Sequence, residues 1–169
     1  KPQNLEIEFK EKYKDIFALP RGAGYWIWKH KIIFDTLKNV NDGDIVIYSD
    51  SGSSFNSKAK KRFFEYIEML NDSKFGNFRI QCEKQYIEKD WTTKELFNYF
   101  NIDLDSEIAK STQLEATQMI FKKSQDSMDF FNEYSDVISH DMYLISDEYN
   151  SSNQVESFVE NRHDQSIFS

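Results

Sequence analysis

The sequence is poor in cysteine and in long apolar runs, and each shortage excludes a class of protein. Cys82 is the single cysteine among 169 residues, so neither an internal disulfide nor a cysteine-based zinc site can form within one chain. No apolar run approaches the roughly 18 residues that span a bilayer, and the N-terminus lacks the basic-then-apolar pattern of a signal peptide. We therefore expect a protein of a reducing compartment, cytoplasmic and without a membrane span.

Positive charge is also scarce. Lysine and arginine number 21 against 29 aspartates and glutamates, which gives a net charge of -8 and a pI near 4.9. Such a balance repels a polyphosphate backbone, so we expect no nucleic-acid partner. The densest basic run comprises Lys58, Lys60, Lys61 and Arg62. It begins an amphipathic segment, and we interpret it as the solvated face of a helix, without a function.

Aromatic side chains are abundant. They make up 16% of the chain, with 15 Phe and 9 Tyr, and supply bulky material for a packed core. A chain of this length buries roughly 70% of the surface that its unfolded form exposes, so a single domain is expected.

The spacing of apolar residues predicts the secondary structure. Helices are expected at residues 5–17, 25–37, 57–70, 92–100 and 124–138, with Ser57 and Thr92 or Thr93 as caps. Strands are expected at 45–48 and 75–83, a short extended piece at 86–91, a flexible turn at 21–24 and a loop at 147–154. Residues 111–123 fit either a helix or a strand, and we favour a helix followed by a strand from Thr117 to Lys122.

Three polar clusters lie far apart in the sequence. The apolar run that starts at Ile45 ends abruptly at Asp50, and ligands of open α/β sheets bind beyond the carboxyl ends of the strands. The other clusters lie at residues 21–29 and 161–166. This distribution predicts a composite site at Asp50.

The same clusters carry a resemblance to a known family. They read Arg21-Gly-Ala-Gly-Tyr-Trp-Ile-Trp-Lys29, Gly43-Asp-Ile-Val-Ile-Tyr-Ser-Asp50-Ser-Gly52 and Arg162-His-Asp-Gln-Ser-Ile-Phe-Ser169. In this order they resemble GT-A-type glycosyltransferases, the nucleotide-diphospho-sugar transferases of bacteria and large DNA viruses. The resemblance implies one α/β domain over residues 1–169, with a Rossmann-like, mixed but mostly parallel sheet flanked by helices. It also implies a first nucleotide-binding strand upstream of Lys1.

The resemblance implies a chemistry as well: a nucleotide-sugar donor, a glycan or lipid-linked acceptor, and Mn²⁺ or Mg²⁺ at the diphosphate. Asp50 and His163 are the implied metal ligands, and a ligating imidazole favours Mn²⁺. Many enzymes of this fold carry a second acid where this chain has Gly52, so one acid alone matches. The implied donor-binding residues are Arg21, Gly22, Asp50, Ser51 and Gln113.

On the acceptor side, the resemblance suggests Trp28 and Lys29, whereas we assign Trp26 to the core. Asp164 is the candidate for the catalytic base, and Gln165 is expected to hydrogen-bond the sugar. A structural alternative for Asp164 is the cap of a C-terminal helix.

Two other functions stay open at this point. A noncatalytic module on the same fold would bind a carbohydrate or a partner protein, and a sugar nucleotidyltransferase would share the need to bind a diphosphate. Whether a transferase of this sequence retains or inverts the anomeric configuration is also open.

Overall fold

The computed structural model describes residues 4–169, and its centre is a three-stranded sheet of order β1-β3-β2. The strands are β1 (Ile45–Ser49), β2 (Asn77–Gln81) and β3 (Leu114–Lys122). β3 is antiparallel to both neighbours, with Ile120 opposite Ile47 on one side and Phe78 on the other. The predicted Rossmann-like, mostly parallel sheet is therefore wrong.

The position of β3 explains this error. β1 and β2 run in the same direction and are joined through a helix, as in a parallel crossover, but β3 lies between them and runs the other way. For β3 to run parallel to β2, the connection between these two strands would have to return the chain to the end of the sheet at which β2 begins. Met119 and Phe121 of β3 are fully buried, which suits a central strand. Its apolar sequence does not report its direction.

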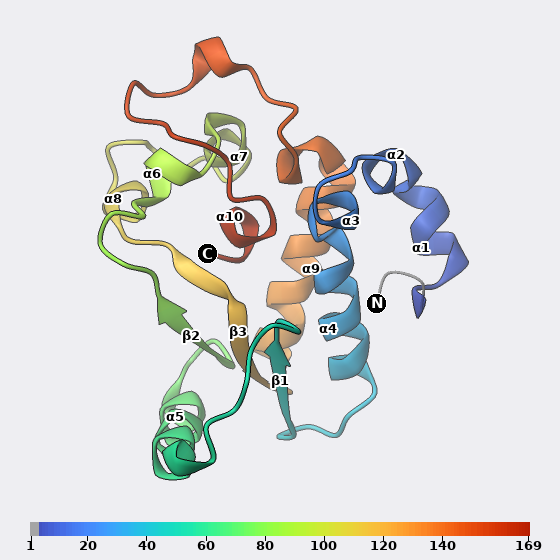
Figure 1. Ribbon diagram of the computed structural model, residues 1–169, viewed down its shortest axis with the longest axis vertical. Helices are drawn as coiled ribbons and strands as arrows, with labels where there is room; N and C mark the ends of the chain where they lie inside the picture. Colours follow the sequence, from blue (N-terminus) through green and yellow to red (C-terminus); the bar gives the residue numbers. More distant parts are fainter. Residues whose placement is uncertain (1–3) are drawn as a thin grey trace.

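Three helices cover one face of this sheet: α4 (Ile27–Lys38), α9 (Gln125–His140) and α10 (Asp164–Phe168). α4 and α9 lie side by side, and α10 lies between them and β3 (Figure 1). Phe121, Phe131 and Phe168 pack where these elements meet, and the rings of Phe121 and Phe131 are 4.9 Å apart, edge to face. Aromatic side chains thus fill much of the core, as the composition predicted.

The other elements lie around this centre. α5 (Lys60–Asp72) contacts β2 and β3 and packs on the opposite face of the sheet from α4 and α9 (Figure 1). The remaining helices are α1 (Ile7–Lys12), α2 (Lys14–Phe17), α3 (Gly22–Tyr25), α6 (Glu88–Trp91), α7 (Lys94–Tyr99) and α8 (Glu107–Lys110). Short 3-10 turns occur at Ser57–Ala59, Met142–Ile145 and Ser151–Asn153. Within residues 4–169, no helix combines the length and apolarity that a bilayer crossing requires.

Several predicted elements keep their place but change their ends. The helix expected over residues 5–17 is interrupted at Tyr13, whose φ of -112° is not helical. Asn56, not Ser57, caps the turn before α5 by accepting a hydrogen bond from the Lys58 amide. Thr93 caps α7 as predicted, because its hydroxyl accepts from the Leu96 amide.

Two segments differ in type. Residues 111–116 were expected to be helical, but α8 ends at Lys110 and β3 begins at Leu114. Buried Ala116 and Met119 face the core from β3, so tertiary packing decides an ambiguous pattern. The extended piece expected at residues 86–91 is mostly the short helix α6, although Ile87 does form a bridge to Thr112.

Candidate active site

The three polar clusters meet at one cavity of about 250 Å³. Arg21 and Lys29 line it from the N-terminal cluster, Asp50 from the end of β1, and His163 and Asp164 from the C-terminal cluster. Ala116 and Thr117 of β3 also line it. The antiparallel sheet thus still delivers Asp50 to a composite site, next to β3, whose Thr117 carbonyl accepts from the Asp50 amide at 3.0 Å.

Unusual backbone conformations bring the N-terminal cluster into place. Gly22 has a φ of +58°, and a Cβ there would lie 2.6 Å from the Trp26 ring. Glycine is therefore required on two counts, conformation and space. Trp26 itself has a φ of 60°, and it lines the cavity half-buried rather than belonging to the core as predicted.

Lys29 lies at the centre of the charged groups. Its side chain is 4% exposed, and its Nζ lies 2.6 Å from Asp164 Oδ2 and 3.7 Å from Asp50 Oδ1. Nζ also donates to the Ala116 carbonyl at 3.1 Å. One ammonium therefore holds together two carboxylates that would otherwise repel each other.

Asp164 is almost fully buried, and burial raises its pKa to about 6 although Lys29 opposes the shift. The nearby Asp50 charge raises this pKa further. The contact between Lys29 and Oδ2 is a close ion pair, but Oδ2 has no partner in hydrogen-bonding geometry. The ammonium at 2.6 Å is therefore the charge partner of this oxygen, and Asp164 lines the cavity as a buried, paired carboxylate.

Asp50 is positioned by its own strand. The Tyr48 hydroxyl donates to Asp50 Oδ1 at 2.6 Å, and burial, followed by this hydrogen bond, raises the pKa of Tyr48. The other predicted acid of the site, Asp164, is the first residue of α10, and His163 holds the N-cap position without a side-chain cap hydrogen bond. The structural alternative of a helix cap is therefore not what is observed.

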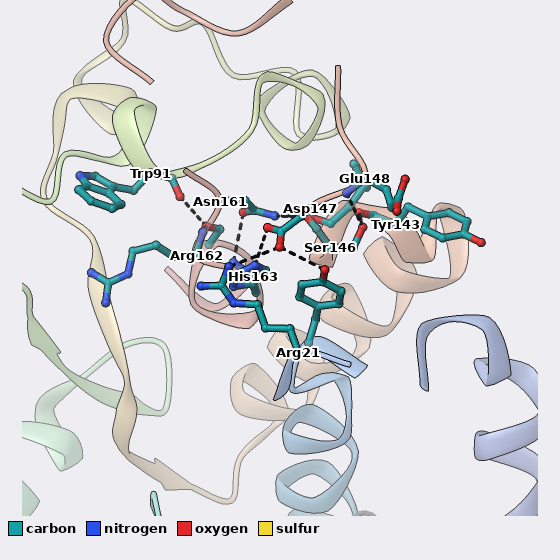
Figure 2. Close-up of polar contacts among 12 residues, drawn as sticks. Arg21, Trp91, Tyr143, Ser146, Asp147, Glu148, Asn161, Arg162 and His163 are labelled. Carbon is teal, nitrogen blue, oxygen red and sulfur yellow. Dashed lines mark hydrogen bonds and ion pairs between the residues drawn. The ribbon is translucent and has the colours of Figure 1, made fainter. Parts of the chain in front are cut away.

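His163 pairs with a residue that the sequence analysis did not single out, Asp147. Its Nε2 lies 2.9 Å from Asp147 Oδ1, and the hydroxyl of Tyr25 donates to Oδ2 at 3.1 Å. Arg21 reaches the same carboxylate at 3.4 Å, so its side chain and that of His163 converge on Asp147 (Figure 2). Burial lowers the pKa of His163 although Asp147 opposes this. Burial tends to raise the pKa of Asp147, but the hydrogen bond and charge of His163, the Tyr25 hydroxyl and the Arg21 charge together outweigh it, and the net shift is downward.

The two predicted glutamines form a buried layer below the cavity. Gln165 Nε2 donates to Gln113 Oε1 at 2.9 Å, and Gln113 Nε2 donates to Thr92 Oγ1 at 3.0 Å. Gln165 lines the cavity, whereas Gln113 is fully buried. Gln165 is thus the one placed to meet a ligand, and Gln113 fixes its orientation.

Three other predicted residues, Gly22, Trp28 and Ser51, lie outside the cavity lining. Trp28 donates its indole N–H to the Gly22 carbonyl at 3.0 Å, which stabilises the turn before α4. Ser51 is exposed in the turn that follows Asp50. Lys29 lies inside the cavity as a buried ion-pair partner of Asp164.

The donor set bears on the implied Mn²⁺ or Mg²⁺. Asp50 offers one carboxylate, while His163 Nε2 is bonded to Asp147. Within the described residues, no three His, Cys, Asp or Glu side chains are grouped as a metal site. These residues fit an ion that arrives with a diphosphate, because Mg²⁺ commonly takes one or two protein carboxylates and completes its shell with phosphate and water. Asp50 would be its protein ligand.

Comparison of the chain with protein-family models, curated proteins and solved structures found no match. Function is therefore inferred from the cavity itself. It combines a buried acid whose pKa is about 6, a second carboxylate, a buried ammonium and an exposed guanidinium at its mouth. Strongly shifted groups in a cleft are typical of functional sites.

Proposed function

We propose that this protein is a glycosyltransferase that moves a sugar from a nucleoside-diphosphate donor to a hydroxyl group of a glycan or lipid-linked acceptor. The observation that carries the proposal is the meeting of Arg21, Lys29, Asp50, His163 and Asp164 at one cavity. These residues come from the three sequence clusters that resemble nucleotide-sugar transferases. A mostly parallel sheet is not part of the proposal.

Asp164 is the proposed base. In the transfer, the acceptor oxygen forms a bond to the anomeric carbon, the bond from that carbon to the diphosphate breaks, and the acceptor proton moves to Asp164. A base with a pKa of about 6 is ionised near neutral pH and can still accept a proton. Its position supports this role, because Asp164 lines the cavity beside Asp50 and Lys29.

The departing diphosphate needs positive charge nearby. Arg21 is the candidate, since its side chain is 45% exposed at the cavity and carries a donor fork that suits phosphate. A divalent ion held by Asp50, when bound, would neutralise further charge on the diphosphate. Lys29 is engaged by two carboxylates and one carbonyl, so it positions Asp50 and Asp164 rather than the donor.

A thermal-shift panel tests this proposal. UDP-, GDP-, dTDP- and CMP-sugars are added with and without Mn²⁺, because a ligand that binds the folded form raises the melting temperature. We expect one nucleotide class to raise it, and the Asp50→Ala variant to lose that shift. The exposed Asp42→Ala variant is the matched control and should keep it. If Asp50→Ala bound and transferred as the natural protein does, the site assignment would be wrong, and glycan binding without any nucleotide would favour a noncatalytic module.

A further inference from the structure

A second, larger cavity lies on the opposite face of the sheet. It measures about 350 Å³ and is bounded by the outer faces of the three strands and by α5. The side chains of Ile47, Phe63, Tyr66, Phe78 and Ile80 line it. We call this cavity the outer groove. Its size falls within the range of small-molecule sites, which are mostly apolar.

The outer groove follows from the strand alternation. Val46 and Tyr48 of β1 pack against the core, so Ile45 and Ile47 face outward and are 36% and 42% exposed. The loop after β1 adds Phe55, which is 77% exposed beside the groove. Exposed apolar side chains gathered around a cavity indicate a binding surface more than scattered ones do.

Positive charge lines the rim of the outer groove. Lys60 and Arg62, from the first turn of α5, border the cavity, and that turn contains no acidic residue. Lys58, Lys60 and Lys61 form no ion pair within the described part of the chain, and Arg62 pairs with Glu65 alone. In a protein of net charge -8, this basic run beside an apolar cavity favours a ligand that is both apolar and anionic.

We propose that the outer groove binds one molecule of an anionic amphiphile: its hydrocarbon chain lies along the sheet, and its phosphate contacts Lys60 and Arg62. The basic run, which we first interpreted as a solvated helix face, then has a ligand. The inference rests on the proposed function in one respect, because it makes the acceptor a lipid phosphate.

The outer groove and the candidate active site are neighbours across the sheet edge. Ser49 at the end of β1 and Gln118 of β3 line the outer groove. Their chain neighbours Asp50 and Thr117 line the active-site cavity. The chain that leaves Asp50 passes directly to Ser53 and Ser54 at the groove. The two cavities are therefore adjacent at the end of β1, where Asp50 follows Ser49.

Calorimetry with dodecyl phosphate below its micelle concentration tests this inference on the whole chain. We expect saturable binding, with inorganic phosphate and the neutral dodecyl maltoside each at least tenfold weaker. Ile47→Glu should weaken binding at least tenfold by placing a charge in the outer groove. Ile7→Glu, on the distant α1, is the matched control and should bind normally, since Ile7 is 76% exposed (Figure 1).

A second variant covers the case in which Ile47→Glu does not fold. The double change Lys60→Ala with Arg62→Ala should weaken dodecyl phosphate at least tenfold and leave dodecyl maltoside unchanged. Equal binding by the natural protein and both variants would overturn the inference, as would binding to anionic vesicles alone. If the natural protein formed dimers that Ile47→Glu dissociates, and bound no amphiphile, the outer groove would instead be an interface between two copies of the chain. Asp50→Ala should keep dodecyl phosphate binding, so this site and the nucleotide site can fail separately.

Discussion

Replacement of Asp164 by asparagine should change how stability depends on pH. Asp164 is buried against Lys29, and burial raises its pKa from 3.8 to about 6. The folded state therefore holds this proton more tightly than the unfolded state does. A carboxyl group of this kind contributes stability below its unfolded pKa and loses that contribution as the pH rises through its folded pKa.

The size of the effect follows from the shift. The difference between about 6 and 3.8 is about 2.2 pKa units, and at about 1.36 kcal/mol per unit it corresponds to about 3 kcal/mol of unfolding free energy. The loss should occur between pH 4 and 6.5. Asparagine has similar size and no titrating proton, so the Asp164→Asn variant should lack this component.

Urea denaturation of both proteins at half-unit steps from pH 4 to 7.5 measures the effect. The difference between the natural protein and Asp164→Asn should change by about 3 kcal/mol across the window, in favour of the variant as the pH rises. The control Asp42→Asn removes an exposed carboxyl and should give a constant difference. A constant difference for Asp164→Asn too would refute the burial argument and remove the physical reason to assign the base there.

Two further changes test the surroundings of the site. Asp147→Asn should lower the pKa of His163 further in an NMR titration, because the Asp147 carboxylate raises it in the natural protein; an unchanged titration would contradict the pairing. Phe131→Ala should cost about 3–5 kcal/mol in chemical denaturation, because large-to-small changes at fully buried aromatic residues leave a cavity. A loss below 1 kcal/mol would show that the core adjusts around Phe131.

Local patterns in the sequence predicted most elements but not their arrangement. Helical spacing placed α4, α5 and α9 within a few residues, and the Thr93 hydroxyl gave the start of α7. The mostly parallel sheet implied by the resemblance was wrong, and the sequence of β3 gave no warning, because a buried strand reads as a continuous apolar run in either orientation. Strand direction depends on which distant segments pair, and alternation along one strand does not encode that.

In the candidate site, too, some residues could be predicted from local sequence patterns and others could not. Asp50 was identifiable because an isolated carboxylate ends an apolar strand, and the Asn161–Ser166 cluster placed His163 and Asp164 together. Asp147 was missed because it lies in a polar stretch, where an acidic residue is expected whether or not it has a function. Lys29 carried a signal that can be recognised afterwards: it directly follows Trp26, Ile27 and Trp28, which are residues of largely buried types.

The buried Lys29–Asp164 ion pair can be compared with what an apolar pair would contribute to stability. A buried ion pair is a weak source of stability, because desolvation of two charges offsets much of their attraction. Well-packed apolar residues in both places would serve the core as well. The ion pair adds little to the stability of the fold, but it is suited to proton transfer. The Lys29 ammonium holds Asp164 beside Asp50, and the pKa of Asp164 is near the range where proton transfer is efficient. The pair therefore supports the proposed role of Asp164 as a base more than it supports a role in stability.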